Sequence, residues 1–319
     1  MHRLTHSFEF NIVPAPPYDF NLTVRNPAGW HLFTPFEIYE ECALWTATHF
    51  ATSLIGLRLS SRGTVNDRVI VVHVFSRDEL EQAQQNDIKK LVKKALGVDQ
   101  DLSEFYRIAR KDSILKYAVE DLYGMHDTFA ITIFPDAVLA ILLQMAPLKR
   151  SNEMMSSFIQ DYGEVAEFDR KKITVWPVPE RISLVSENDL AKTCKVGYRA
   201  KNIVNLAKRL AKGDFPTTEQ LENLEPKEAK KVLLELPGIG DYSADIINPH
   251  GGFPIDVWSA EVFSKLLFGK EPENNRDAVG IVKEEGLKRW GKWSWMAFFY
   301  IVQDLPNLSK KLEKNLRLS

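Results

Sequence analysis

The segment 236–240, which reads Leu-Pro-Gly-Ile-Gly, constrains the fold of this chain more strongly than any other. Apolar residues recur at spacings of three and four in 226–236 and in 241–247, which predicts a helix on each side of the segment. Glycines let a ligand approach the backbone closely, and the first amides of the second helix have no partner within that helix. Together with the positive end of the helix dipole, these amides favour a phosphate group at the turn.

A single carboxylate follows this hairpin. Asp256 lies 256 − 242 = 14 residues after Tyr242, so one short helix and one loop separate it from the hairpin. From this place Asp256 can present its carboxylate to whatever the hairpin binds. The alternative is that Asp256 only caps the helix expected at 257–268, since Asp is a preferred N-cap residue. The two roles are compatible, and the sequence leaves both open.

The first part of the chain is rich in strand signals. Runs of β-branched and apolar residues, broken by turn residues, lie at 8–13, 54–59 and 69–75. Residues 77–96 show the pattern of an amphipathic helix, and a short helix is expected to begin within 34–40. Residues 1–98 are therefore predicted to form a small α+β domain built on an antiparallel sheet.

From residue 99 onward the apolar spacing is helical. It predicts an all-α domain over 99–319, with the helix–hairpin–helix at about 226–248. A chain of 319 residues is long enough for about two domains, which agrees with this division. The predicted fold class is thus α+β, with a small N-terminal sheet domain followed by a helical one.

Charge and cysteine content exclude several classes of protein. The net charge of −2 rules out a broad basic coat, although a phosphate site made of backbone amides needs no excess of lysine. Cys42 and Cys194 are too few for a disulfide framework or a four-cysteine cluster. No apolar run is long enough to span a membrane, and the N-terminus lacks a signal-peptide pattern, so an intracellular protein is expected.

The hairpin followed by Asp256 resembles the helix–hairpin–helix (HhH-GPD) DNA glycosylase superfamily. The similarity is greatest to the AlkA-type 3-methyladenine DNA glycosylase II, with some similarity to the 8-oxoguanine DNA glycosylases. Further segments that look like those of the family follow in the same order, at 16–19 (Pro-Pro-Tyr-Asp), 140–145, 176–182, 197–201 and 290–299. The resemblance covers roughly residues 115–305 well and the N-terminal domain loosely.

This resemblance implies a monomeric, cytoplasmic and nucleoid-associated enzyme of base excision repair, with no membrane partner. Its partner is double-stranded DNA with damaged bases, and such an enzyme extrudes the damaged base into a pocket. Cleavage of the N-glycosidic bond develops positive charge on the sugar. We expect the ionised carboxylate of Asp256 to stabilise this charge and to orient or deprotonate a water molecule.

Tyr242 departs from the commonest form of the family. In the bifunctional members of the family that the chain resembles, such as the 8-oxoguanine glycosylases, this hairpin position is a lysine. That lysine attacks the sugar and forms a Schiff base. A phenol cannot form that imine, and AlkA-like members carry an aromatic residue at the equivalent place. The resemblance therefore predicts a monofunctional glycosylase without lyase activity, in which Tyr242 lines the base pocket. The alternative is a half-buried tyrosine that only packs on the next helix.

A late aromatic segment supplies further candidates for the base pocket. By resemblance, Trp293 matches a pocket tryptophan of the AlkA type, and Phe299 falls where the 8-oxoguanine enzymes stack a phenylalanine. Trp295 replaces the polar residue that reads oxidised guanine. With Tyr242 and Ile246 these residues predict an aromatic pocket that favours electron-poor alkylated bases through cation–π attraction. Packing in the helical core is the alternative for each aromatic residue.

The remaining expectations concern DNA and a cation. We expect the DNA contacts to come from Leu236, Gly238, Ile239, Gly240, Tyr242 and Met145. Met145 is the candidate wedge, because an unbranched apolar side chain can fill the gap left by an extruded base. The resemblance implies a structural Na⁺ or K⁺ ion at the hairpin, held by the backbone carbonyls of Leu234, Leu236 and Ile239, and no other cofactor.

Three hypotheses about function follow. The first is a monofunctional glycosylase for alkylated purines that uses Asp256. The second keeps the fold and the reaction but takes 8-oxoguanine, hypoxanthine or mismatched thymine as the main target. The third is a helix–hairpin–helix DNA-binding protein without catalysis, in which Asp256 is only a helix cap.

Overall fold

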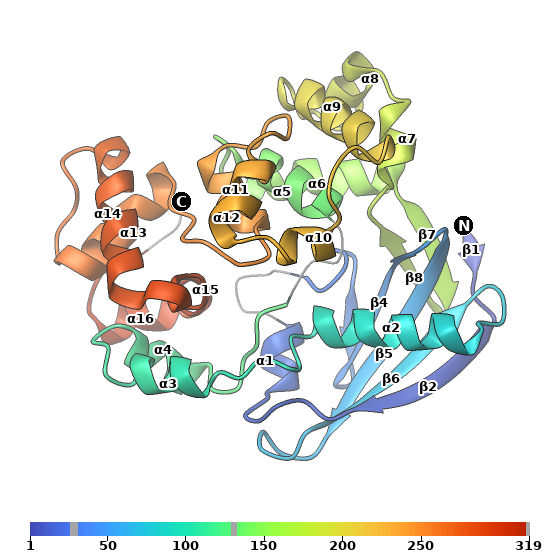
Figure 1. Cartoon of the computed structure of the whole chain (residues 1–319), viewed down its shortest axis with the longest axis horizontal. Helices are drawn as coiled ribbons and strands as arrows, with labels where there is room; N and C mark the ends of the chain where they lie inside the picture. Colours follow the sequence, from blue (N-terminus) through green and yellow to red (C-terminus); the bar gives the residue numbers. More distant parts are fainter. Residues whose placement is uncertain (26–30, 129–132, 317–319) are drawn as a thin grey trace.

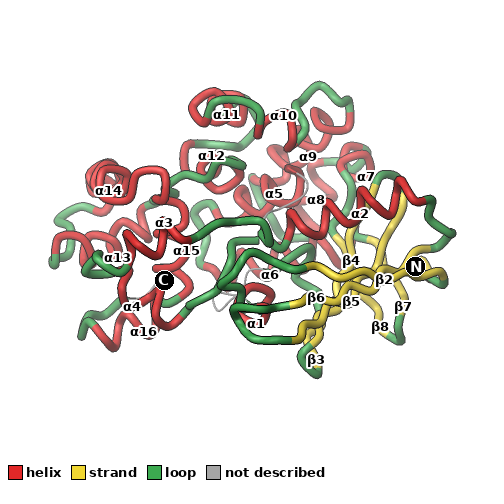
Figure 2. Tube along the Cα trace, turned by 60° about the horizontal axis from the view of Figure 1, so that its bottom comes forward, coloured by secondary structure: helices red, strands yellow, loops and turns green. Residues whose placement is uncertain are grey.

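The computed structural model describes residues 1–25, 31–128 and 133–316. A five-stranded antiparallel sheet occupies one end of the molecule, and helices make up most of the rest (Figures 1 and 2). The strands, in the sheet order β2-β6-β5-β4-β3, are β2 (His6–Ile12), β6 (Val69–Ser76), β5 (Ser53–Arg62), β4 (Ala43–Phe50) and β3 (Ile38–Glu40). The three strand signals of the sequence correspond to β2, β5 and β6.

Each face of this sheet has its own apolar cluster. Side chains of β6 alternate between buried and half-buried, as expected for a strand with period two. Ile70 and Val72 pack against Ile88 and Val92 of α2 (Gln82–Ala95), the helix expected from the sequence. The short helix α1 (Phe20–Val24) completes this cluster.

The opposite face of the sheet carries a second, smaller sheet. Its strands are β1 (His2–Arg3), β7 (Glu164–Phe168) and β8 (Lys171–Val175), in the order β1-β7-β8. Phe168 packs on the large sheet at Gly56, where an added Cβ would lie 2.5 Å from the Phe168 ring. The absence of a side chain at Gly56 therefore allows the two sheets to meet closely.

Two expectations from the sequence are wrong at this point. Residues 99–319 are not all-α, because β7 and β8 form a hairpin whose turn residues, Asp169 and Arg170, both have positive φ. Residues 34–40 do not begin a helix, since Ile38–Glu40 is the edge strand β3, paired with β4. β3 is joined to β4 by a tight turn, with Glu40 paired to Ala43, and β7 pairs with the distant β1 as well as with β8, so strand pairing decides the structure in both places.

The helices form two groups with separate cores. The first group consists of α5 (Ile133–Leu143), α6 (Leu148–Tyr162), α7 (Pro179–Ser183), α8 (Glu187–Thr193), α9 (Arg199–Ala211), α10 (Thr218–Glu222), α11 (Pro226–Leu233) and α12 (Asp241–Ile247). The second group consists of α3 (Ser103–Ala109), α4 (Leu115–Asp121), α13 (Val257–Phe268), α14 (Asn275–Trp290), η1 (Gly291–Trp293), α15 (Ser294–Gln303) and α16 (Leu305–Lys311).

The chain thus leaves the second group after α4, builds the first, and returns at α13. Figure 1 shows α3 and α4 beside α13 to α16, away from α7 to α9. Among the described residues, no helix is both long and apolar enough to cross a membrane. This path brings the segment after α4, the helix α12 and the start of α13 to the boundary between the two groups.

Candidate active site

The hairpin lies between α11 and α12 and has a tightly constrained turn. Gly238 has φ +80°, and an added Cβ would lie 2.8 Å from the Asn202 side chain. Gln144, just after α5, donates hydrogen bonds through Nε2 to the carbonyl of Gly238 (2.7 Å) and to Ser243 Oγ (3.1 Å). Glycine at position 238 therefore suits both the left-handed backbone conformation and the close approach of Asn202. The bonds from Gln144 hold the turn against the end of α5.

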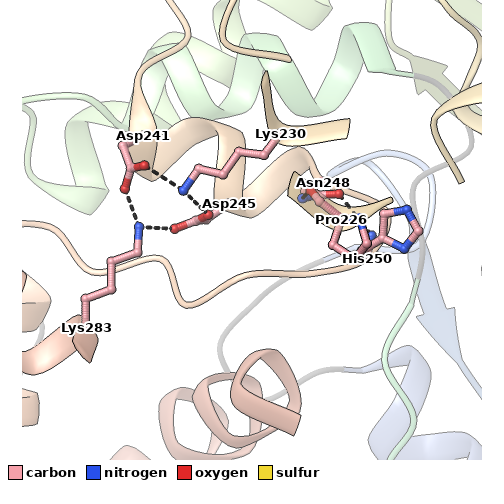
Figure 3. A network of polar contacts seen from close by, with 7 residues as sticks. All are labelled: Pro226, Lys230, Asp241, Asp245, Asn248, His250 and Lys283. Carbon is pink, nitrogen blue, oxygen red and sulfur yellow. Dashed lines mark hydrogen bonds and ion pairs between the residues drawn. The ribbon is translucent and has the colours of Figure 1, made fainter. Parts of the chain in front are cut away.

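A network of charged groups connects the hairpin to the second helix group (Figure 3). Lys230 Nζ of α11 lies 2.6 Å from carboxylate oxygens of both Asp241 and Asp245 of α12. Lys283 of α14 pairs with the same two carboxylates, and the Asp245 side chain is only 4% exposed. Burial raises the pKa of Asp241, but the bonds from Lys230 and Lys283 outweigh it and hold the pKa below its usual range.

Asp256 is the N-cap of α13. Its Oδ1 accepts hydrogen bonds from the backbone N–H of Trp258 (3.1 Å) and Ser259 (2.8 Å) and from Ser259 Oγ (2.7 Å). The backbone N–H of Asp256 in turn donates to Ser259 Oγ at 2.9 Å, which completes a capping box. No described residue bonds Oδ2. The capping role is therefore real, and it fixes the carboxylate while leaving one oxygen for another partner.

A cavity of about 710 Å³ lies beside Asp256. Of the site residues expected from the sequence, the structure places Asp256, Tyr242, Ile246 and Trp295 on its wall. Burial, and after it the negative charge of Asp256, raises the pKa of the Tyr242 phenol. The Tyr242 hydroxyl therefore stays neutral next to the carboxylate.

Trp293 and Phe299 are not on this wall, contrary to the expectation. On α15, Trp295, Phe298 and Val302 line the cavity, at helical spacings of three and four. Phe299 is not on that face of the helix. Phe299 is 1% exposed within the core of its helix group. Trp293 packs against Phe105, with ring centroids 5.7 Å apart. Core packing therefore describes both residues.

Met145 lies next to the hairpin and projects into solvent. It has φ +49° and is 75% exposed, which is unusual for a large apolar residue without a left-handed preference. Arg199 donates a hydrogen bond to the carbonyl of Gln144, the preceding residue. Since Gln144 also holds the carbonyl of Gly238, Met145 and the hairpin turn are fixed relative to each other.

Sequence reasoning missed two carboxyl groups of the cavity. Asp127 follows α4, Asp136 lies in the first turn of α5, and both line the cavity. Trp295 Nε1 donates a hydrogen bond to Asp127 Oδ2. Burial raises the pKa of Asp127 to about 7, and burial followed by the charge of Asp127 raises that of Asp136 to about 7. The only sequence signal was an aspartate on either side of an apolar stretch, which is weak.

The described residues include no group of three or more His, Cys, Asp and Glu side chains suited to a metal ion. The backbone carbonyls of Leu234, Leu236 and Ile239 are the groups expected to hold a monovalent cation. The carbonyl of Leu236 accepts a hydrogen bond from the Ile239 N–H at 3.1 Å. A carbonyl has a second lone pair, so this contact is compatible with a bound cation. The cation remains a prediction.

No family model matches the chain. A curated relative, the DNA-3-methyladenine glycosylase of Bacillus subtilis (strain 168), is 24% identical over 272 residues, covering 82% of this chain and 88% of the relative. The probable N-glycosylase/DNA lyase of Methanothermobacter thermautotrophicus is 23% identical, covering 63% of this chain and 70% of its own.

Two solved structures share the fold of this chain. The 3-methyladenine DNA glycosylase from Archaeoglobus fulgidus covers 96% of this chain and all (100%) of its own, with a TM-score of 0.74 and 18% identity. The 8-oxoguanine glycosylase/lyase of Clostridium acetobutylicum, in complex with double-stranded DNA, covers 95% of this chain and 99% of its own, with a TM-score of 0.70 and 16% identity. The predicted resemblance to the helix–hairpin–helix DNA glycosylases is thus confirmed: the homologues and structural neighbours of this chain are glycosylases of that superfamily.

Proposed function

We propose that this chain is a DNA glycosylase of base excision repair. The observation that carries the proposal is Asp256, whose Oδ1 is fixed by the start of α13 while its side chain lines a cavity large enough for a base, next to the hairpin. The curated relative from Bacillus subtilis, named as a DNA-3-methyladenine glycosylase, supports it. In this role a damaged base is extruded from the duplex and occupies the cavity.

The proposed chemistry uses the free oxygen of Asp256. As the N-glycosidic bond breaks, the sugar becomes positively charged, and an oriented carboxylate nearby stabilises that charge. The same oxygen can orient the water that attacks the sugar and take its proton. The neutral Tyr242 phenol does not add a second charge at this position.

We further propose that the enzyme is monofunctional. No lysine is among the described residues that line the cavity. The hairpin position that would hold the lysine of a bifunctional enzyme is Tyr242 in this chain. An imine with the sugar therefore has no nucleophile on this wall. The relative named as a lyase is the observation that favours the opposite, and the experiment below distinguishes the two.

Alkylated purines are the substrates we propose. Trp295 and Phe298 stack on each other with centroids 6.1 Å apart and present flat apolar surface to the cavity. Stacking on such surfaces is worth about 1–3 kcal/mol per base. Oxidised guanine is the second candidate, favoured by the structural likeness to an 8-oxoguanine glycosylase/lyase.

DNA contacts are proposed at the hairpin and at Met145. The backbone of Leu236, Gly238, Ile239 and Gly240 would approach a phosphate, with a Na⁺ or K⁺ ion held by the carbonyls of Leu234, Leu236 and Ile239. Met145, exposed and fixed beside the turn, would fill the gap left by the base. We propose that the chain acts as a monomer on nucleoid DNA.

A panel of duplexes with single lesions tests these proposals. Each duplex carries an alkylated purine, hypoxanthine, 8-oxoguanine or mismatched thymine, and products are scored with and without alkali. We expect release of alkylated purines and strand breaks only after alkali. Strand breaks without alkali would show a lyase, and no release from any duplex would favour a DNA-binding protein without catalysis.

A further inference from the structure

The cavity wall carries negative charge without basic partners. Its carboxyl groups are those of Asp127, Asp136, Glu222 and Asp256, and the described residues that line it include no lysine or arginine. Glu222 is paired with Lys94 Nζ at 2.5 Å, and Asp256 is bound by the amides of its helix. Asp127 and Asp136 are therefore the carboxyl groups of this wall that no cation of the described chain compensates.

Asp127 is also under-bonded for a buried carboxyl group. The residue is 2% exposed, its Oδ2 accepts the Trp295 indole N–H, and its Oδ1 has no hydrogen-bond partner among the described residues. Burying a polar atom without a partner costs free energy, and for a charged group the cost is larger. A positive charge held close to this carboxyl group in the cavity would offset that cost.

Asp112, a carboxylate whose side chain is 7% exposed, shows what a purely structural role looks like. It accepts hydrogen bonds from Arg289 Nε (2.6 Å), from the Trp290 indole (3.1 Å), and from the backbone of Ile114 and Leu115. Its pKa is held below the usual range by these partners, which outweigh burial. Asp127 has the Trp295 indole and a smaller contribution from the backbone of Thr128, and no ion pair in the described structure.

A bound cation would change this balance at Asp127. An opposite charge within a few ångströms favours the ionised form of a carboxyl group and offsets its burial. The unbonded Oδ1 belongs to a residue of the cavity wall, and the same carboxyl group holds Trp295, whose ring is part of the stacking surface. A flat cation stacked on Trp295 would thus lie next to Asp127.

We propose that Asp127 determines substrate specificity by receiving purines that carry a positive charge through N-alkylation. This inference rests on the proposed glycosylase function and deepens it, since it names the charge of the substrate and the residue that reads it. A neutral damaged base stacks on the same rings, but it does not offset the free-energy cost of burying the Asp127 carboxylate. Asp127 therefore discriminates by charge, whereas Trp295 and Phe298 discriminate by shape.

The variant Asp127→Asn tests the proposal, because it keeps the size of the side chain and removes the charge. Single-turnover excision is measured on two duplexes of identical sequence, one with 7-methylguanine, which is cationic, and one with hypoxanthine, which is neutral. We expect the rate on the cationic base to fall by about tenfold or more, since a nearby opposite charge is worth roughly one to three pKa units. The rate on hypoxanthine should change much less.

Asp304→Asn is the matched control. Asp304 is also a buried carboxyl group, 1% exposed and with its pKa raised to about 7 by burial, but it is not part of the cavity wall. Its replacement should leave the ratio of the two rates unchanged. Equal losses on both lesions in Asp127→Asn, with the ratio preserved, would overturn the proposal and assign Asp127 a structural role.

A binding measurement separates this proposal from the proposed function. If the wild type releases neither base, the glycosylase assignment fails, and equilibrium binding of the same two duplexes still tests Asp127. A preference for the cationic duplex that Asp127→Asn loses supports charge recognition, whereas equal binding of both by the wild type contradicts it. Should Asp127→Asn not fold, Asp136→Asn removes the neighbouring charge and is expected to reduce the preference in the same assays.

Discussion

At the scale of single residues, Asp256 caps α13 and is the residue to which we assign the chemistry. Its Oδ1 receives three donors from the start of α13, so the carboxylate cannot rotate freely. The other oxygen has no bond from a described residue. A carboxylate held in this way needs little reorganisation when charge develops on a sugar, which is the condition for electrostatic stabilisation of a transition state.

The replacement Asp256→Asn tests this view. The amide oxygen can still cap α13, but it cannot stabilise a cation or accept a proton from water. We expect the single-turnover rate to fall by about 10²–10³-fold or more, while the affinity for lesion DNA changes little. Retention of the wild-type rate would remove Asp256 from the mechanism, and a parallel loss of DNA binding would point to a misplaced α13 instead.

Asp127 also makes a prediction about stability. Its folded-state pKa is raised to about 7 by burial, far above the ordinary 3.8, and Asp136 is the charged group that the structure places against it. A raised carboxyl pKa contributes stability that is present at low pH and is lost as pH rises through 7. Asp127→Asn does not titrate, so its stability relative to the wild type should grow from pH 5.5 to about 7 and stay constant from there to pH 8.

Melting temperatures of both proteins at several pH values measure this difference. The comparison removes the contribution of other buried groups, such as His31, whose pKa is lowered to about 4 by burial and whose effect on stability has the opposite sign. Between pH 5.5 and the folded-state pKa of about 7 the expected gain is at most about 2 kcal/mol, the equivalent of one and a half pKa units. A difference that does not vary with pH would show that Asp127 is ionised throughout.

At the scale of elements, the charged network of Lys230, Asp241, Asp245 and Lys283 positions the hairpin relative to the second helix group. Lys283 reaches from α14 to two carboxylates of α12, and Asp245 among them is almost fully buried. An added Cβ at Gly252 would lie 2.6 Å from the Asp245 Cβ, so the loop that leads to Asp256 rests on the same residue. The network thus positions both the hairpin and the loop that leads to Asp256.

Lys283→Met is the corresponding test. Removal of one ammonium leaves buried negative charge with Lys230 alone, and we expect the free energy of unfolding to fall by about 1–3 kcal/mol, less than for a fully buried pair. Lys288→Met, an exposed position on the same helix, should have almost no effect. Chemical denaturation of both variants measures the difference, and equal stabilities would mean that solvent replaces the ion pair.

At the scale of the whole molecule, the small β1-β7-β8 sheet joins the N-terminal sheet to the helices. Phe168 fills the space above Gly56 and is only 3% exposed. Phe168→Ala is expected to lower the free energy of unfolding by about 3–5 kcal/mol, since it leaves a cavity between the sheets. Val13→Ala, at a position that is 71% exposed, is the control and should be nearly neutral in the same denaturation experiment.

The sequence alone determined the elements whose formation depends on local pattern. Residues 241–247 and 257–268 form α12 and α13 with the expected bounds, because their apolar periodicity, the glycine turn and the Asp256 cap all lie within a few residues. The resemblance to the helix–hairpin–helix glycosylases rests on the same short segment. The contribution of Tyr242, Ile246, Trp295 and Asp256 to one cavity was also expected from it.

Only the tertiary structure decided what depends on residues far apart in the chain. The β7–β8 hairpin is stabilised by β1 and by the large sheet, neither of which is near it in sequence. Phe298 rather than Phe299 reaches the cavity because the rotation of α15 is fixed by its packing on other helices. Asp127 joins Trp295 across 168 positions of sequence. Burial and charge compensation are properties of such distant contacts, and no local pattern encodes them.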